Sequence, residues 1–150
     1  LSEAKVTVAG VPDVPGVAAR IFTIVAETGA NVDMIVQNIG ADGRTDMTFS
    51  CPVDEVVRAQ KALGDLKAKG EVSWATLDVD DNVAKVSIVG IGMRSQTGVA
   101  HRMFEALARD GVNIKVITTS EIKVSVLIDR KYLELAVQAL HDAFELHTAA

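Results

Sequence analysis

The sequence predicts an α+β protein made of two tandem copies of one small module, covering 1–80 and 81–150. The first observation is a repeat: at a fixed offset of 82 positions, residues 15–32 and 97–114 are identical at eight of eighteen positions. The second is that hydrophobic spacing in each copy alternates between the periods of strands and helices. Duplicated small modules suit the binding of one ligand class at related sites, which points towards sensing and away from a single active site.

The first half of the first copy predicts a strand followed by a helix. Val6 and Val8 alternate with polar residues, which is typical of a strand. After a turn over 10–15, Pro15 is expected at the first position of the helix, and Gly29 is placed to end it. The inward face of this helix is expected to hold Val17, Ile21, Phe22 and Val25.

The second half of the first copy predicts two strands, a helix and a final strand. The segment 31–39 is rich in β-branched residues, and a hairpin turn at 41–43 leads to a strand with clear alternation. A helix is expected over 54–69 and a strand over 71–79, which includes Trp74. The inward positions of the third strand and this helix are expected to be Met47, Phe49, Cys51, Val56, Leu63 and Leu66.

The second copy repeats this order after a short polar linker at 80–82. Its strands are expected over 84–91, 112–119 and 121–128, and its helices over 98–110 and 130–145. The last helix is expected to turn Leu133, Val137, Leu140 and Phe144 inward. Five residues follow it, so the fourth strand of this copy is expected to be missing. The short tail, a segment upstream of Leu1 or another chain would have to supply it.

Strand, helix, strand, strand, helix, strand is the order of the ferredoxin-like split unit. Its antiparallel sheet carries both helices on one face and leaves the other face to be covered by something else. Each module holds roughly half of the 150 residues, near the lower limit for an independent core. The modules are therefore expected to lean on each other or on a partner chain.

The composition excludes several classes of function. A net charge of −5 with scattered lysines and arginines gives no basic footprint for nucleic acid. The chain has no apolar run near the roughly 20 residues of a membrane span, and its start has no signal-peptide pattern. The single cysteine, Cys51, excludes an internal disulfide framework and fits a reducing compartment. We therefore expect a cytoplasmic protein.

No catalytic or metal-binding constellation emerges from the sequence. The three histidines are His101, His141 and His147, and none has the spacing of a metal pair. Cys51 falls on the inward face of a strand, where an inert thiol is expected. A phosphate-binding loop is absent, and Gly90-Ile91-Gly92 lacks the third glycine of a dinucleotide fingerprint. A self-contained enzyme is therefore disfavoured, with no catalytic residues, metal or cofactor.

The loop that opens the first helix is the leading candidate for binding. Gly16 leaves the backbone uncovered at a helix N-terminus, where free N–H groups favour a carboxylate. Asp13 precedes it and could accept from an ammonium group, so the pair suits a zwitterionic amino acid. The alternative is that Asp13 caps the turn and Pro15-Gly16 makes it tight.

Further polar residues extend this candidate. Gln37 lies among apolar neighbours, so it is expected to bond either a ligand or another strand. In the second copy the loop 92–98 contains no acid, which predicts a different selectivity. Glu121 could supply the missing acceptor, or it could be an exposed turn carboxylate.

Four motifs carry a resemblance to a known family. They are a D-x-P-G-x-A loop at 13–18, N-V-D-M-I-V-Q-N at 31–38, T-D-M-T-F-S-C at 45–51, and T-S-E-I-K-V-S-V-L-I at 119–128. Together they resemble the tandem ACT domains of aspartate kinase, above all its small regulatory (beta) subunit, which is also the C-terminal part of the large subunit. The resemblance covers essentially the whole chain. The amino-acid kinase domain, a phosphotransferase, is absent from it.

The resemblance implies feedback regulation by an end-product amino acid, L-threonine, L-lysine or both. It also implies a homodimer, a catalytic (alpha) subunit as partner, and effectors at interfaces between ACT domains of two chains. The implied effector site comprises Asp13, Pro15, Gly16, Val17, Ala18 and Gln37, closed by Asn113 and Ile114 of a partner chain. The implied second effector site comprises Ser95, Gln96, Gly98, Val99, Thr119, Ser120 and Glu121, with Asn31 and Val32 opposite.

The sequence departs from the family pattern in two ways. The strand that usually completes the second ACT domain precedes the first domain, and this chain starts too late to include it. The second loop also lacks the D-x-P-G pattern. The competing hypothesis is an assembly module of the same fold that dimerises or scaffolds a partner without any small molecule.

Overall fold

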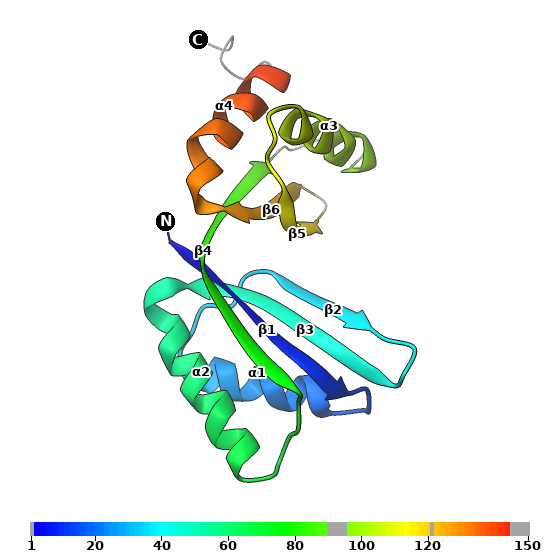
Figure 1. The fold of residues 1–150 in the computed structure, drawn as a ribbon, viewed down its shortest axis with the longest axis vertical. Coiled ribbons are helices and arrows are strands. Elements are labelled where there is room, and N and C mark those ends of the chain that lie inside the picture. Colours follow the sequence, from blue (N-terminus) through cyan, green and yellow to red (C-terminus); the bar gives the residue numbers. More distant parts are fainter. Residues whose placement is uncertain (1, 90–95, 121, 145–150) are drawn as a thin grey trace. The chain divides into compact units, whose positions relative to one another are not determined.

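The computed structural model describes residues 2–89, 96–120 and 122–144. The chain divides into two compact units, Leu1–Asp81 and Asn82–Ala150 (Figure 1). Each unit has its own buried apolar cluster. The units are therefore described one at a time.

The first unit has the predicted order of strands and helices. Its elements are β1 (Glu3–Pro12), α1 (Val17–Glu27), β2 (Ile35–Ile39), β3 (Arg44–Pro52), α2 (Val53–Ala68) and the first part of β4 (Thr76–Val89). The strands lie in the order β2-β3-β1-β4, and β3 pairs antiparallel with both β1 and β2. Both helices lie on one face of this sheet (Figure 1). The predicted ferredoxin-like fold is confirmed.

Side-chain alternation decides which face of the first sheet is buried. Val6 pairs with Phe49 and Val8 with Met47, and all four side chains are fully buried against the helices. Phe49 also meets Phe22 of α1 edge to face, with ring centroids 5.8 Å apart. Because strand side chains alternate, the opposite face is polar. The predicted inward residues of α1, α2 and β3 all belong to this core or pack against it.

The second unit repeats this plan with three strands in its described part. Its elements are the second part of β4, from Val83, then α3 (Gln96–Arg109), β5 (Ile114–Thr119), β6 (Lys123–Asp129), a short 3-10 turn (Arg130–Tyr132) and α4 (Leu133–Ala143). The strands lie in the order β4-β6-β5, and β6 pairs antiparallel with both neighbours. Its core joins these strands to α3 and α4.

The predicted polar linker at 80–82 is wrong. These residues lie inside β4, which runs on as one strand of 14 residues. The first part of β4 completes the sheet of the first unit, and Val83 opens its pairing with Asp129 of β6. The Asn82 side chain also donates to Asp129 Oδ1 at 3.4 Å. Three consecutive polar residues are typical of a linker. Here they form a strand, because pairing can satisfy the hydrogen-bonding groups of the backbone while the side chains face water.

Several predicted boundaries also shift. β1 continues to Pro12 through an irregularity after Val8, so the predicted turn begins later than residue 10. Pro15 was predicted at the first position of the first helix, but α1 begins at Val17. Gly16 is its N-cap and Pro15 lies in the turn before it. Trp74 is buried ahead of β4 and is not part of it. The predicted second strand begins only at Ile35.

Three of the four residues predicted to face inward from the last helix do so, and Val137 is the exception. Val137 is 40% exposed, whereas Ala136, Ala139 and Leu140 are buried. Leu133 and Phe144 do pack against the second core. The buried face of α4 thus includes two alanines, and Val137 lies at its edge. Across the described ranges, the structure contains no helix that is both long enough and apolar enough to span a membrane.

Candidate functional site

The loop between β1 and α1 is anchored at its base and exposed along its length. The Asp13 N–H donates to the Gly43 carbonyl of the hairpin turn at 2.9 Å, and the Val14 N–H donates to the Pro12 carbonyl at 3.0 Å. All four residues of 13–16 are exposed to solvent. A ligand could therefore reach this loop without moving it.

Gly16 fixes the start of α1 in a conformation that suits glycine. Its φ is 91°, in the left-handed region, and its carbonyl accepts from the Arg20 N–H at 3.0 Å. A Cβ at this position would meet nothing within 4 Å, so the backbone angle and not crowding calls for glycine. Within the described residues no side chain caps α1, and its first turn holds no acid. The positive end of the helix is thus open to an anion.

Val17 and Ala18 continue the site into the helix. Both are half-buried and pack against the first core, which holds the first turn of α1 in place. The structure therefore brings five of the predicted residues together on one continuous segment, namely Asp13, Pro15, Gly16, Val17 and Ala18.

Gln37 differs from its prediction. Its apolar neighbours in the sequence predict a buried or half-buried side chain, but the side chain is exposed. The reason is that β2 is an edge strand of five residues that pairs only with β3. Its pairing partner is the buried Met47, so Gln37 lies on the same face of the sheet as the two helices. The helices do not reach as far as this edge strand, and the Gln37 side chain is therefore exposed. It needs no internal partner and is accessible to a ligand.

Asn31 also differs from its prediction, because it does not open the second strand. Its backbone N–H donates to Glu55 Oε1 at 2.8 Å, and its side-chain amide donates to the same oxygen at 3.2 Å. Glu55 lies in the first turn of α2, so these bonds tie the segment before β2 to that helix. Val32 is half-buried and packs against the first core. Both residues therefore have structural roles in the first unit.

The remaining predicted residues lie in the second unit. Asn113 is exposed just before β5, and Ile114 pairs with Ile128 of β6. Thr119 ends β5 and Ser120 follows it, where the Ser120 N–H donates to the Lys123 carbonyl at 2.7 Å. Ser95 and Glu121 lie outside the described residues, as does the side chain of Gln96.

The second helix start is not equivalent to the first. At the repeat offset Gly98 corresponds to Gly16, but α3 already begins at Gln96. Gly98 therefore lies inside α3, whereas Gly16 precedes α1, and Val99 is one turn into the helix. The predicted start of this helix at residue 98 was too late. A ligand at this helix start would meet a different set of N–H groups.

Sequence reasoning missed two residues behind the first loop. The Gly10 N–H donates to Asp46 Oδ1 at 3.0 Å, and Arg44 Nη1 donates to the Gly10 carbonyl at 3.0 Å. Both side chains come from the start of β3 and line a small cleft of about 240 Å³. The signal for them was present in the sequence, since Gly10 interrupts an alternating strand.

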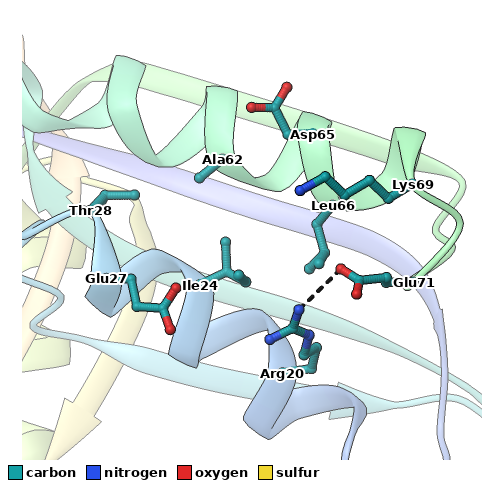
Figure 2. Close-up of a pocket in the computed structure, with 9 residues that line it drawn as sticks. All are labelled: Arg20, Ile24, Glu27, Thr28, Ala62, Asp65, Leu66, Lys69 and Glu71. Carbon is teal, nitrogen blue, oxygen red and sulfur yellow. Dashed lines mark hydrogen bonds and ion pairs between the residues drawn. The ribbon is translucent and has the colours of Figure 1, made fainter.

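A separate groove of about 240 Å³ lies between α1 and α2. Figure 2 shows the Arg20 side chain reaching from α1 to Glu71, which follows α2, with an N–O distance of 3.0 Å. The counterpart of Arg20 in the repeat, Arg102, instead donates to the Ala143 carbonyl and stacks over Phe144. The repeated arginine therefore joins the two helices of each unit, and the groove contains none of the predicted effector residues.

The other titratable candidates have structural explanations. Burial raises the pKa of the Cys51 thiol from 9.0 to about 11, and the nearby carboxylate of Glu3 adds to the shift. Cys51 is fully buried on β3, as the sequence predicts. His101 lies 3.1 Å from Glu105, one helical turn away on an exposed face. No cluster of three metal-ligating side chains occurs within residues 2–89, 96–120 and 122–144.

Comparison with known proteins finds two matches to the ACT domain family, over residues 5–70 and 86–144. Among characterised relatives, the aspartate kinase Ask_LysC of Stutzerimonas stutzeri is 53% identical over 148 residues, which is 99% of this chain and 35% of that protein. The chain thus spans about a third of the length of the curated relatives it matches.

Solved structures give the same match at the level of the fold. A crystal structure of aspartokinase alpha and beta subunits matches with a TM-score of 0.85 and 48% identity, over 95% of this chain and 93% of that one. The ligand-free regulatory subunit of aspartate kinase from Thermus thermophilus matches with a TM-score of 0.87 and 40% identity, over 96% of this chain and 93% of that one. Aspartokinase III of E. coli, in complex with lysine and aspartate, shares the fold with a TM-score of 0.69 and 20% identity. The match covers 94% of this chain and 31% of that one.

Proposed function

Because this chain belongs to the family of tandem ACT-domain regulatory regions of aspartate kinase, we propose that it binds an end-product amino acid and passes that signal to a catalytic partner. The kinase domain is absent from the chain, so the chemistry would be done by that partner. We assign one ACT domain to 1–80 and one to 81–150, in a cytoplasmic protein. The proposal rests on the open start of α1 with Asp13 ahead of it.

The geometry of the loop fits the two charges of an amino acid. A carboxylate would accept from the first N–H groups at the start of α1, those of Gly16 and Ala18, where the helix dipole favours negative charge. The Val17 N–H between them donates to the Val14 carbonyl at 3.4 Å, a long bond that a carboxylate could share. The ammonium group would face Asp13, which is exposed four residues before the helix. A ligand with only a carboxylate would leave Asp13 without a partner, and an apolar ligand would leave both Asp13 and the helix N–H groups without one.

Threonine is the effector that we favour. Its hydroxyl is carried by the β-carbon, so a neutral polar partner such as the exposed Gln37 amide suits it. Lysine needs a second acidic partner for its side-chain ammonium group, and the residues proposed for this site include only one acid, Asp13. Lysine accompanies aspartate in E. coli aspartokinase III, which makes it the comparison ligand.

We propose that the site is completed by a second copy of the chain. In the homodimer, Asn113 and Ile114 of one chain would close the loop of the other. A ligand that bridges two chains favours one arrangement of them by its differential affinity, and a catalytic subunit can sense that arrangement. The second site, around Gly98 and Thr119, would bind differently because its helix begins three residues earlier in the repeat.

An assembly module without a ligand is the competing function. It is favoured by the edge strand β2, where Ile35 and Ile39 are 52% and 62% exposed. Exposed apolar residues on an unpaired edge are suited to self-association. In that case the chain would dimerise equally well with and without an amino acid.

A calorimetric titration of the purified chain with L-threonine, L-lysine and L-alanine separates the two functions. We expect saturable heat with threonine and none with alanine. Asp13→Ala should weaken threonine binding about tenfold, because it removes a charge-assisted hydrogen bond. Asp65→Ala is the matched control, since Asp65 is an exposed acid on α2 that pairs with Lys61. If Asp13→Ala keeps the affinity of the wild type, the role of Asp13 is wrong, and if no amino acid gives heat, the assembly function holds.

A further inference from the structure

The strand that leads into the effector loop contains a β-bulge. In the pairing of β1 with β3, Val8 is opposite Met47, and the next pair is Val11 with Thr45. Two residues of β1, Ala9 and Gly10, thus lie opposite the single residue Asp46. An extra residue of this kind leaves backbone groups without ladder partners and bends the strand.

Side chains of β3 take over the bonds that the bulge breaks. The Gly10 N–H donates to Asp46 Oδ1, and the Gly10 carbonyl accepts from Arg44 Nη1, both at 3.0 Å. Gly10 has a φ of +74°, and a Cβ there would come within 2.9 Å of the Ala75 side chain. The backbone angle, the close approach and the two bonds all hold this one residue in place.

The same short segment of β3 and its turn also anchors the loop. Pro12 pairs with Arg44, and the Asp13 N–H donates to the Gly43 carbonyl. The turn itself is closed by the Gly40 N–H, which donates to the Arg44 carbonyl at 2.8 Å. Asp42 Oδ1 accepts from the Arg44 N–H at 3.1 Å, which holds Arg44 from its other side.

The bulge decides which way the chain after it faces. Val8 and Val11 are both fully buried although three positions separate them. In a regular strand, residues three apart face opposite sides of the sheet. The extra residue restores Val11 to the core, and it therefore sets the direction in which Pro12 and Asp13 leave the strand.

We infer that Asp46 and Arg44 are positioning residues for the effector loop, acting through Gly10. They hold the bulge that aims Asp13 at the start of α1. The two carboxylates of the cleft, Asp42 and Asp46, both accept backbone N–H groups. Their bonding identifies the cleft as a scaffold and not as a second ligand site. The inference rests on the proposed function, since it assigns these residues to the same site.

The test uses the full chain and pairs of variants that separate shape from charge. Asp46→Ala removes the acceptor for the Gly10 N–H, whereas Asp46→Asn keeps an oxygen in the same position. Arg44→Ala and Arg44→Lys form the second pair, because lysine retains one donor. Lys61→Ala is the control, since Lys61 is exposed on α2 and pairs only along that helix in the described residues.

Two readouts are measured on each variant: amide hydrogen exchange at Gly10 and Asp13, and calorimetric affinity for threonine. Asp46→Ala should speed exchange at both amides and weaken threonine binding about fivefold, the scale of one lost hydrogen bond. Asp46→Asn should stay within about twofold of the wild type in both. Arg44→Ala gives an independent test if Asp46→Ala fails to fold.

The outcomes distinguish this inference from the proposed function. Unchanged exchange at Asp13 in Asp46→Ala and Arg44→Ala would overturn the inference, whatever the ligand does. Faster exchange with unchanged threonine affinity would also overturn it, because the loop would then move without consequence for binding. If Asp46→Asn weakens binding as much as Asp46→Ala, the charge of Asp46 acts on the effector directly and the positioning role is wrong. A wild-type chain that binds no amino acid would refute the proposed function, while the exchange data would still decide whether the bulge holds the loop.

Discussion

At the scale of single residues, the candidate site depends on two glycines with different physical reasons. Gly10 is required by both its φ of +74° and the close approach of Ala75. Gly16 is required by its φ of 91° alone, because the space around it is open. A side chain can therefore be introduced at Gly16 without a clash, which makes this position a direct probe of what binds at the helix start.

Gly16→Asp should abolish the response to threonine while the chain stays folded. The new carboxylate would occupy the positive end of α1 in place of the effector carboxylate. Gly16→Asn is the matched control, because it carries the same backbone strain, roughly 1 kcal/mol, without the charge. Calorimetry and thermal unfolding of both variants check the prediction. Equal threonine affinity in Gly16→Asp and Gly16→Asn would contradict an anion site.

The stability of the chain should carry a pH signature from Cys51. The pKa of its thiol is about 11 in the folded chain against 9.0 for the ordinary value. Between pH 9 and 11 the unfolded thiol ionises while the folded one stays protonated, so stability falls as pH rises, by about 2–3 kcal/mol. The difference in unfolding free energy between wild type and Cys51→Ala should shrink over this window in urea titrations. A constant difference from pH 8 to 11 would show that burial does not perturb the thiol.

At the scale of elements, alternation and repeat spacing predicted nearly every strand and helix, but not where the strands begin and end. Residues 31–34 are rich in strand-forming side chains, yet the Met34 N–H donates to the Ser50 side chain at 3.0 Å. A side-chain acceptor thus replaces part of the regular ladder there. A sequence pattern cannot reveal such a bond, because it depends on which residue lies opposite. The bonds of Asp46 were missed for the same reason, although Gly10 within an alternating strand indicates an irregularity there.

The start of α2 should depend on one carboxylate. Glu55 accepts from both the backbone and the side chain of Asn31, and its own side chain is largely buried. Glu55→Ala should destabilise the chain by about 1 kcal/mol, because the exposed N–H groups of Asn31 lose a charged acceptor. Glu55→Gln keeps an acceptor oxygen and should cost less. Urea unfolding of the two variants measures this, and equal losses would mean that the charge at the helix start matters more than the bonds to Asn31.

At the scale of the whole molecule, the two copies of the repeat resemble each other more in the packing of their cores than at their helix starts. Both units bury the same kind of apolar core, and their shared arginine joins two helices in each. The two helix starts differ, with Gly16 before α1 and Gly98 inside α3. Sequence identity across the repeat therefore predicted the fold of both units. It did not predict equal sites, because identical residues in the two copies do not fix where each helix begins.

Self-association through the edge strand β2 and effector binding should weaken together if the site lies between two chains. Ile39→Lys places a charge on the exposed edge of the first sheet and should disfavour strand pairing there. Val57→Lys is the matched control, because Val57 is 70% exposed on α2. Sedimentation with and without threonine should show weaker dimerisation for Ile39→Lys only. Its thermal stabilisation by threonine should also become more dependent on protein concentration, since a ligand shared by two chains is linked to their association. If Ile39→Lys is monomeric and still binds threonine as tightly as the wild type, one chain holds the complete site and the partner's contribution from Asn113 and Ile114 is wrong.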